Sequence, residues 1–209
     1  MKLITEWKEI DEAHKDSDGK YYIEGVFMQA EKKNRNGRIY KRSILEKAVD
    51  DYNTQQVKTG RAVGELNHPD SPTVNLKEAS HRILSLEWQG DNVVGKALIL
   101  NTPNGQTVKG LLDGGVRLGV SSRGMGSLRT VEGVNYVEDD FILNTVDIVQ
   151  DPSAHDAYVN GIMEGVEWVK NRSGIWESKN VDVKQNETEL IDESTKLREI
   201  KELLSRLIT

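Results

Sequence analysis

The sequence predicts an α+β fold in which short strands outnumber helices. The clearest sign is a hairpin, whose strand-like runs 79–88 and 93–100 are joined by Gln89-Gly90-Asp91-Asn92. Other runs rich in β-branched and aromatic residues recur along the chain, and two segments with helical periodicity lie between them. Beyond the hairpin, we expect strands at 21–30, 61–66, 116–123 and 141–149.

Both expected helices carry terminal signals. Ser43 and Glu46 form a capping box for the first helix, which should run to about Val57. Thr102-Pro103 fits the N-cap and first position of the second helix, which Gly114-Gly115 ends. The apolar face of the first helix is predicted to consist of Ile44, Leu45, Ala48, Val49 and Tyr52.

The length of 209 residues suggests one domain with appended ends. Residues 1–20 are polar and charged, and we expect a flexible N-terminal segment there. Residues 21–177 hold the expected strands and helices and form the main domain. Residues 178–209 are typical of a polar linker followed by an amphipathic helix, which has little stability alone and should dock on another surface.

Composition excludes several classes of protein. The net charge of −6 argues against a non-specific nucleic-acid binder. The absence of cysteine excludes disulfides, thiolate zinc sites and a cysteine nucleophile. No apolar run approaches the ~20 residues of a membrane span, and no signal peptide is recognisable. We therefore expect a soluble, intracellular protein without a cofactor and with neither nucleic acid nor a membrane as its partner.

The main candidate for chemistry is the glycine-rich stretch Gly119–Gly126, in which two hydroxyls stand side by side. Ser121 and Ser122 are followed there by Arg123. Glycines allow a close approach of the backbone, and adjacent N–H groups can stabilise a developing negative charge. A serine in this setting is a candidate nucleophile, although two serines between glycines are more often ordinary turn chemistry.

A serine nucleophile needs a base and usually an acid that orients the base. Of the four histidines, His68 has the most favourable position, because it follows the end of a predicted strand. His81 lies within a strand, where a structural role is favoured. Asp147 interrupts an apolar strand, and a buried carboxylate there needs a partner, which is the backbone, an arginine or His68.

Two other kinds of site compete with this interpretation. Glu65, His68, Asp70 and His81 offer the ligands of a metal-dependent hydrolase, but they match no spaced motif. The glycines of 114–126 lack the Gly-Lys-Ser/Thr ending of a phosphate loop, which disfavours nucleotide binding.

Several segments taken together resemble one known family, the prohead core proteases of T4-like tailed phages. They occur in the same order over roughly residues 20–160, which makes the likeness more specific than a single motif. The resemblance implies a serine endopeptidase related in fold to herpesvirus assemblin-type proteases, which is a small, mostly antiparallel β-barrel surrounded by helices. The matching segments are 22–30, 44–49, Gly64-Glu65-Leu66-Asn67-His68-Pro69, Gly119-Val120-Ser121-Ser122-Arg123-Gly124-Met125-Gly126-Ser127-Leu128, Val146-Asp147-Ile148-Val149 and Asp151-Pro152-Ser153-Ala154.

The resemblance also implies roles for individual residues. His68 would be the general base, Ser121 the nucleophile and Asp147 the third member of the triad. The backbone N–H groups of Arg123 and Gly124 would form the oxyanion hole.

Two of these assignments have alternatives. A shift by one residue would make Ser122 the nucleophile. Ser121 is favoured because it shares the polar face of its strand with Arg123. Asp151 or His81 are alternatives to Asp147 as the third member.

The resemblance finally implies which proteins are cleaved and at which sites. The resemblance implies that scaffold and capsid proteins inside the prohead, in the host cytoplasm, are the substrates, with cleavage after glutamate in a [Leu/Ile]-x-Glu context. Such tripeptides cluster in both ends of this chain, so we hypothesise that one or both ends are removed when a zymogen is activated. The sequence does not decide whether the protein self-associates. The alternative to a protease is a non-catalytic module that binds scaffold or capsid proteins. The tripeptides include Ile4-Thr5-Glu6, Ile10-Asp11-Glu12, Ile175-Trp176-Glu177, Ile191-Asp192-Glu193 and Leu197-Arg198-Glu199.

Overall fold

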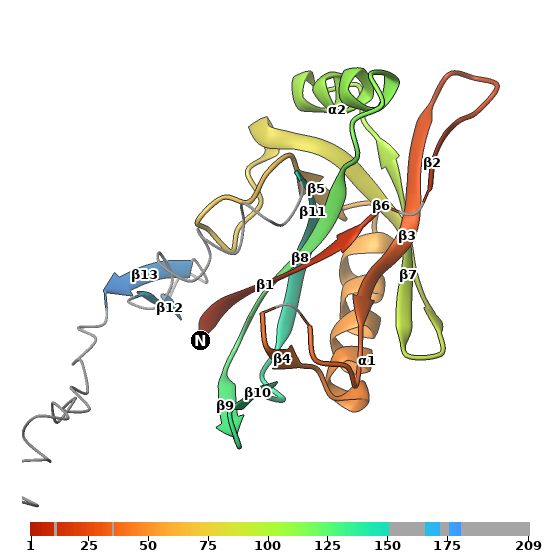
Figure 1. The fold of residues 1–209 in the computed structure, drawn as a ribbon. Coiled ribbons are helices and arrows are strands. Elements are labelled where there is room, and N and C mark those ends of the chain that lie inside the picture. Colours follow the sequence, from red (N-terminus) through yellow and green to blue (C-terminus); the bar gives the residue numbers. More distant parts are fainter. Residues whose placement is uncertain (11, 35, 151–165, 172–175, 181–209) are drawn as a thin grey trace, which may run out of the picture.

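The computed structural model describes residues 1–10, 12–34, 36–150, 166–171 and 176–180, whose strands form four sheets (Figure 1). The α-helices are α1 (Arg42–Tyr52) and α2 (Pro103–Asp113), and a short 3-10 helix spans Leu76–Glu78. The strands are β1 (Lys2–Glu9), β2 (Glu12–Lys15), β3 (Tyr21–Gln29), β4 (Arg38–Ile39), β5 (Val63–Glu65), β6 (Ala79–Gln89), β7 (Asn92–Ile99), β8 (Gly119–Gly126), β9 (Leu128–Val131), β10 (Val134–Val137), β11 (Ile142–Val149), β12 (Val166–Lys170) and β13 (Trp176–Asn180).

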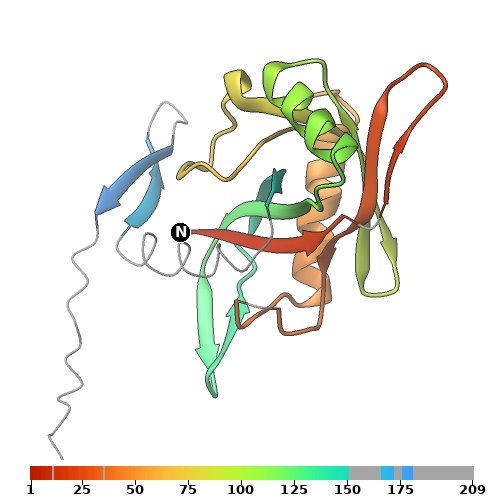
Figure 2. The same ribbon diagram turned by 45° about the horizontal axis from the view of Figure 1, so that its top comes forward.

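Two antiparallel sheets make up the body of the protein. The larger has the strand order β2-β3-β7-β6-β5, and the smaller has the order β1-β8-β11. Helix α1 lies between them, with Leu45, Ala48, Val49 and Tyr52 buried, and α2 lies at one end of the molecule (Figures 1 and 2). The α+β class and the mostly antiparallel pairing are therefore confirmed.

The expected closed barrel is absent from the part of the chain that the structure describes. The two sheets are joined by an isolated parallel bridge between Leu66 and Ile148, and β1 packs against β3 without a ladder between them. Closing a barrel requires continuous pairing around its circumference. Strand β5 has only three residues, so it cannot supply that pairing to β11.

Local signals located most elements correctly. The 79–100 hairpin forms β6 and β7, and Thr102 caps α2 by accepting a hydrogen bond from the Gly105 N–H at 3.1 Å. The expected capping box at Ser43 does not form, because α1 begins at Arg42 and its N-cap, Lys41, makes no side-chain cap. The helix continues to Val57 as a π-helical turn, Asn53–Val57.

The two ends of the chain differ in what the structure describes. Residues 1–20, expected to be a flexible segment, hold β1 and β2, and β1 pairs with β8 along all of its eight residues. The expected boundary at residue 178 falls inside β13. The predicted linker beyond β13 and the amphipathic helix lie outside the described residues.

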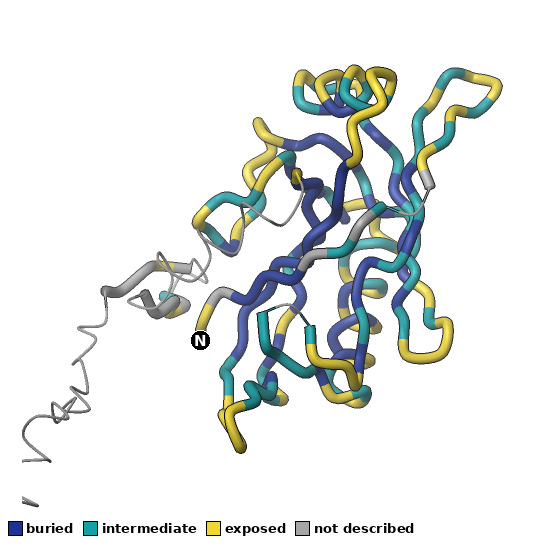
Figure 3. Tube along the Cα trace, in the orientation of Figure 1, coloured by how far each residue is buried: buried dark blue, intermediate teal, exposed yellow. Residues whose placement is uncertain are grey.

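Burial is greatest where β8 crosses the molecule (Figure 3). All eight residues of β8 are buried, which places the glycine-rich stretch inside the protein between β1 and β11. Among the described residues, no helix is long and apolar enough to span a membrane.

Candidate active site

The pairing of β8 with β11 brings two of the predicted residues together. Ser121 and Asp147 are Cα partners in this antiparallel ladder, so their side chains share one face of the sheet. Arg123 lies on the same face two residues along β8, while Ser122 lies on the opposite face. Ser121 and Asp147 have exposed fractions of 1% and 0%. The expected division of β8 into two faces is therefore present.

His68 reaches this face from the other side of β11. After β5 the chain turns at Asn67, whose φ of 69° lies in the left-handed region that asparagine tolerates better than most residues. The Asn67 N–H donates to the Ile148 carbonyl at 2.8 Å, which fixes the turn against β11. The ring of His68 then lies beside Asp147, with Nδ1 at 2.9 Å from Oδ2 and 5% of its side chain exposed.

This contact determines which ring nitrogen of His68 carries the proton. The Asp147 carboxylate can only accept, so Nδ1 of His68 carries the proton and donates it. The nitrogen that is able to accept a proton is then Nε2, which is the arrangement a general base requires.

Asp147 is held by four hydrogen bonds. Oδ2 accepts from His68 and from Arg123 Nε at 2.8 Å, and Oδ1 accepts from the Glu65 N–H at 3.0 Å and Arg123 Nη2 at 3.2 Å. Burial alone would raise the pKa of Asp147, but the His68 hydrogen bond and the Arg123 charge outweigh it and lower this pKa. Asp147 therefore stays ionised.

Arg123 also organises the loop that follows His68. Its Nη2 donates to Glu65 Oε1 at 3.1 Å, and its Nη1 donates to the carbonyl oxygens of Ser71 and Thr73. Glu65 Oε1 in turn accepts from the Asn75 N–H at 2.6 Å. A buried arginine thus links β5, β8, β11 and the 71–75 loop.

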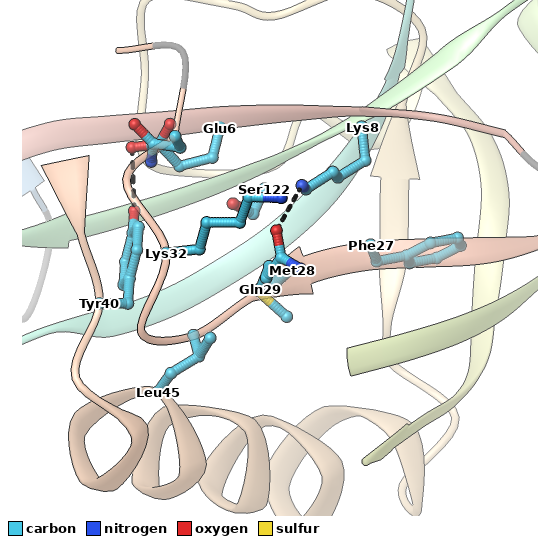
Figure 4. A pocket seen from close by; sticks show the side chains of 10 residues that line it. Glu6, Lys8, Phe27, Met28, Gln29, Lys32, Tyr40, Leu45 and Ser122 are labelled. Carbon is cyan, nitrogen blue, oxygen red and sulfur yellow. Dashed lines mark hydrogen bonds between the residues drawn. The ribbon is translucent and has the colours of Figure 1, made fainter. Parts of the chain in front are cut away.

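The two adjacent serines have different surroundings. The Ser121 Oγ is buried and has no hydrogen-bond partner among the described residues. Ser122 lines a pocket of about 350 Å³, part of it open to solvent, on the opposite face (Figure 4). Glu6 and Tyr40 also line that pocket, whereas His68 and Asp147 do not.

His81, an alternative third member, is a structural histidine in this geometry. Its Nε2 lies 2.9 Å from the Val146 carbonyl and must donate to it, so Nδ1 accepts from the Ser80 hydroxyl at 2.9 Å. Burial lowers the pKa of His81 and keeps the ring neutral. Asp151, the other alternative, lies outside the described residues.

The four residues of the metal-site alternative do not converge. Glu65 is ion-paired with Arg123, both ring nitrogens of His81 are hydrogen-bonded, and Asp70 is exposed. The described residues contain no group of three or more histidine, aspartate or glutamate side chains able to hold a metal ion. Sequence reasoning assigned Glu65 only to this site, and missed its pairing with Arg123.

Comparison with known proteins confirms the family resemblance. The family model described as prohead core protein serine protease matches residues 2–167. The chain is 47% identical over 144 residues to the prohead core protein protease of Enterobacteria phage T4, and this match covers 66% of this chain and 67% of that protein. It is also similar to the solved structure of the bacteriophage T4 capsid assembly protease, with a TM-score of 0.70, 37% identity, and coverage of 72% of this chain and 98% of that one. The chain belongs to the prohead core protein serine protease family.

Proposed function

We propose that this protein is a serine endopeptidase of capsid maturation that cleaves scaffold and capsid proteins inside the phage prohead, within the host cell. The observation that carries the proposal is the 2.9 Å contact between His68 and Asp147 on the face of the sheet that also holds Ser121. Family membership supports the same reaction, since the T4 relative is named a prohead core protein protease.

The proposed reaction follows the chemistry of serine proteases. Ser121 Oγ attacks the carbonyl carbon of the scissile peptide, and His68 Nε2 takes the hydroxyl proton. His68 then gives the proton to the departing amine as the C–N bond breaks. A water molecule, deprotonated by His68, releases the acyl group, and Asp147 stabilises the imidazolium in both steps.

The oxyanion of the tetrahedral intermediate needs donors preorganised in the backbone. We propose the N–H groups of Arg123 and Gly124 for this role, as the family resemblance implies; both residues follow Ser121 on β8. Gly124 is required there, since a Cβ at this position would lie 2.5 Å from the Phe141 ring and 2.6 Å from the Ile142 carbonyl.

The test is cleavage of a purified scaffold protein by the purified chain, with the products identified by mass spectrometry. Ser121→Ala and His68→Ala should each lower the rate by about 10⁴-fold or more, because members of a triad act as a unit. Both variants should keep the circular dichroism spectrum and melting temperature of the wild type within a few degrees.

Ser122→Ala is the control for the neighbouring hydroxyl and should retain most of the activity. Full activity in Ser121→Ala or His68→Ala would refute the serine mechanism. An intact chain that binds the scaffold protein without cutting it would favour the non-catalytic binding module instead. We also propose cleavage after glutamate in [Leu/Ile]-x-Glu sites, which the same spectra would reveal.

A further inference from the structure

Glu65 is a second buried carboxylate beside the candidate triad, and the reaction proposed above gives it no role. The residue is 1% exposed. Its Oε1 accepts from Arg123 Nη2 at 3.1 Å, and the same nitrogen donates to Asp147 Oδ1 at 3.2 Å. One guanidinium group therefore links both carboxylates. A buried charge is costly, so a buried charge this close to the reacting groups is a candidate for a part in the reaction.

Glu65 contacts the site through its main chain as well as its side chain. Its N–H donates to Asp147 Oδ1 at 3.0 Å, and its Oε1 also accepts from the Asn75 N–H at 2.6 Å. His68 lies between Glu65 and Asn75 in the sequence, so the second contact joins the two ends of the loop that carries the base. Closure of this loop is one explanation for Glu65, but a neutral amide oxygen would accept the same hydrogen bonds.

The charges around His68 give a different explanation. Asp147 and Glu65 bring two negative charges and Arg123 brings one positive charge, which leaves one net negative charge beside a neutral imidazole. When His68 takes up a proton, the whole group becomes neutral. Without the charge of Glu65, Arg123 would cancel that of Asp147. The imidazolium would then be a buried charge without compensation, which is unfavourable at low dielectric.

The other titratable groups near Asp147 in the described part of the chain are neutral or exposed. Burial lowers the pKa of the His81 imidazole on β6 and raises the pKa of the Tyr52 hydroxyl on α1, so both side chains stay neutral. Asp70, in the loop that carries the base, is exposed, and solvent screens its charge. The β1 residues in register with Ser121 and Arg123 are uncharged, namely Trp7 and Thr5.

We propose that Glu65 is a positioning residue of the protease reaction, whose negative charge offsets Arg123 so that Asp147 can stabilise the His68 imidazolium. This inference deepens the proposed protease function and rests on it. Glu65 touches neither the substrate nor the reacting atoms. It acts through Arg123 and Asp147, and it makes His68 a stronger base when the Ser121 proton is transferred.

The first experiment follows the protonation of His68 without catalysis, in the full chain carrying Ser121→Ala. Nitrogen NMR spectra of the imidazole ring are recorded between about pH 5 and pH 8, where histidine titrates. Glu65→Gln removes the charge but keeps an oxygen that accepts from Arg123 and Asn75. In this variant the pH at which half of the His68 rings are protonated should fall by about one unit.

Two further variants make this result specific to the charge. Glu78→Gln is the matched control, because it removes the charge of an exposed glutamate in the segment that follows the same loop. It should leave the His68 titration unchanged. Glu65→Asp keeps the charge and should titrate close to the parent chain. An unchanged titration in Glu65→Gln would overturn the proposal, and so would a Glu65→Gln chain that does not fold, since Glu65 would then be structural.

The second experiment measures kcat and KM for cleavage of the scaffold protein over the same pH range, in chains with an intact Ser121. Glu65→Gln should lower kcat at neutral pH by about three- to tenfold, because a base weaker by about one unit accepts the serine proton less readily. KM should stay the same. The acid limb of the kcat/KM profile should move down by about one pH unit, because less of the ring is protonated at acidic pH.

A role limited to loop closure predicts a different profile. It would lower kcat without moving the acid limb, and that result would overturn the proposal. Glu65→Asp should return the acid limb to its wild-type position even where kcat stays reduced. The expected His68 titrations, combined with no cleavage of the scaffold protein by any chain, would support the electrostatic role of Glu65 and refute the protease function.

Discussion

Arg123 is the residue on which the geometry around Asp147 depends most. Its side chain is fully buried and binds both oxygens of Asp147, one oxygen of Glu65 and two carbonyls of the 71–75 loop. Only a guanidinium supplies donors in so many directions, so lysine cannot reproduce these contacts. Two carboxylates share this one arginine, and His68 supplies Asp147 with a further donor.

Replacing Arg123 should therefore be severely destabilising. Arg123→Met leaves Asp147 and Glu65 buried without a cation, which costs about 3–5 kcal/mol when a buried ion pair loses one partner. Urea unfolding measures this cost, with Arg61→Met as the control because Arg61 is exposed. Arg123→Lys should fall between the two. A loss below about 1 kcal/mol in Arg123→Met would contradict this account, since exposed pairs contribute no more than that.

The part played by the Arg123 side chain could not be predicted from the sequence. An apolar strand containing Asp147 predicts that the carboxylate needs a partner, and backbone, arginine and histidine were all open. The structure supplies all three, from Glu65, Arg123 and His68. These contacts depend on the register of β8 against β11, which the local pattern of either strand does not specify.

β5 connects the larger sheet to the candidate site. It pairs with β6, continues into the bridge between Leu66 and Ile148, and leads directly to His68. Gly64 is central to this connection, because a Cβ there would lie 2.3 Å from both His81 Nε2 and the Val146 carbonyl. The absence of a side chain at Gly64 lets His81 hydrogen-bond to β11 beneath β5.

Gly64→Ala should push β5 away from β11 and displace His68. We expect a loss of about 1–3 kcal/mol in the free energy of unfolding, which is the usual cost of inserting atoms into a packed core. Because His68 is displaced, kcat should fall by a larger factor than KM changes. Gly110→Ala is the matched control, since a Cβ there has no neighbour within 4 Å and alanine favours a helix such as α2 by about 0.5–1 kcal/mol. A Gly64→Ala chain as stable as the wild type would show that β5 has room to move.

Sequence patterns of a few residues predicted the elements that are stabilised by neighbours in the sequence. The β6–β7 hairpin and the Thr102 cap of α2 depend on neighbours within a few residues. β1 was missed because its alternating polar residues resemble a solvated segment. Its buried Glu6 is neutralised by Arg38, 32 residues further along the chain, and no local pattern reveals such a partner.

At the level of the whole molecule, the two sheets are held together by α1, by β1 and by the contact of β5 with β11. The resemblance to assemblin-type proteases led to the expectation of a barrel, but the described residues form separate sheets with α1 packed between them. The first nine residues are therefore part of the folded body and also cover the strand that carries Ser121. Removal of the N-terminal end would expose β8 and would also expose apolar surface near Ile4.

Because β1 belongs to the folded body and also covers β8, removal of the N-terminal end is a testable step of activation. If the chain cleaves itself after glutamate, hydrolysis of the Glu6–Trp7 bond would create a new N-terminus at Trp7, and cleavage after Glu12 would create one at Ala13. At the other end, Glu177, Glu193 and Glu199 each follow an isoleucine or leucine by two positions.

Mass spectrometry of the chain recovered from maturing capsids should show at least one of these new termini, and the Ser121→Ala chain from the same capsids should keep both ends. Trimming should precede the appearance of cleaved scaffold protein, because β8 has no open edge while β1 is paired with it. Active protein that retains both ends would refute the processing hypothesis. It would also require β1 to leave β8 by reversible unpairing, which hydrogen exchange of residues 2–9 in the intact chain would detect.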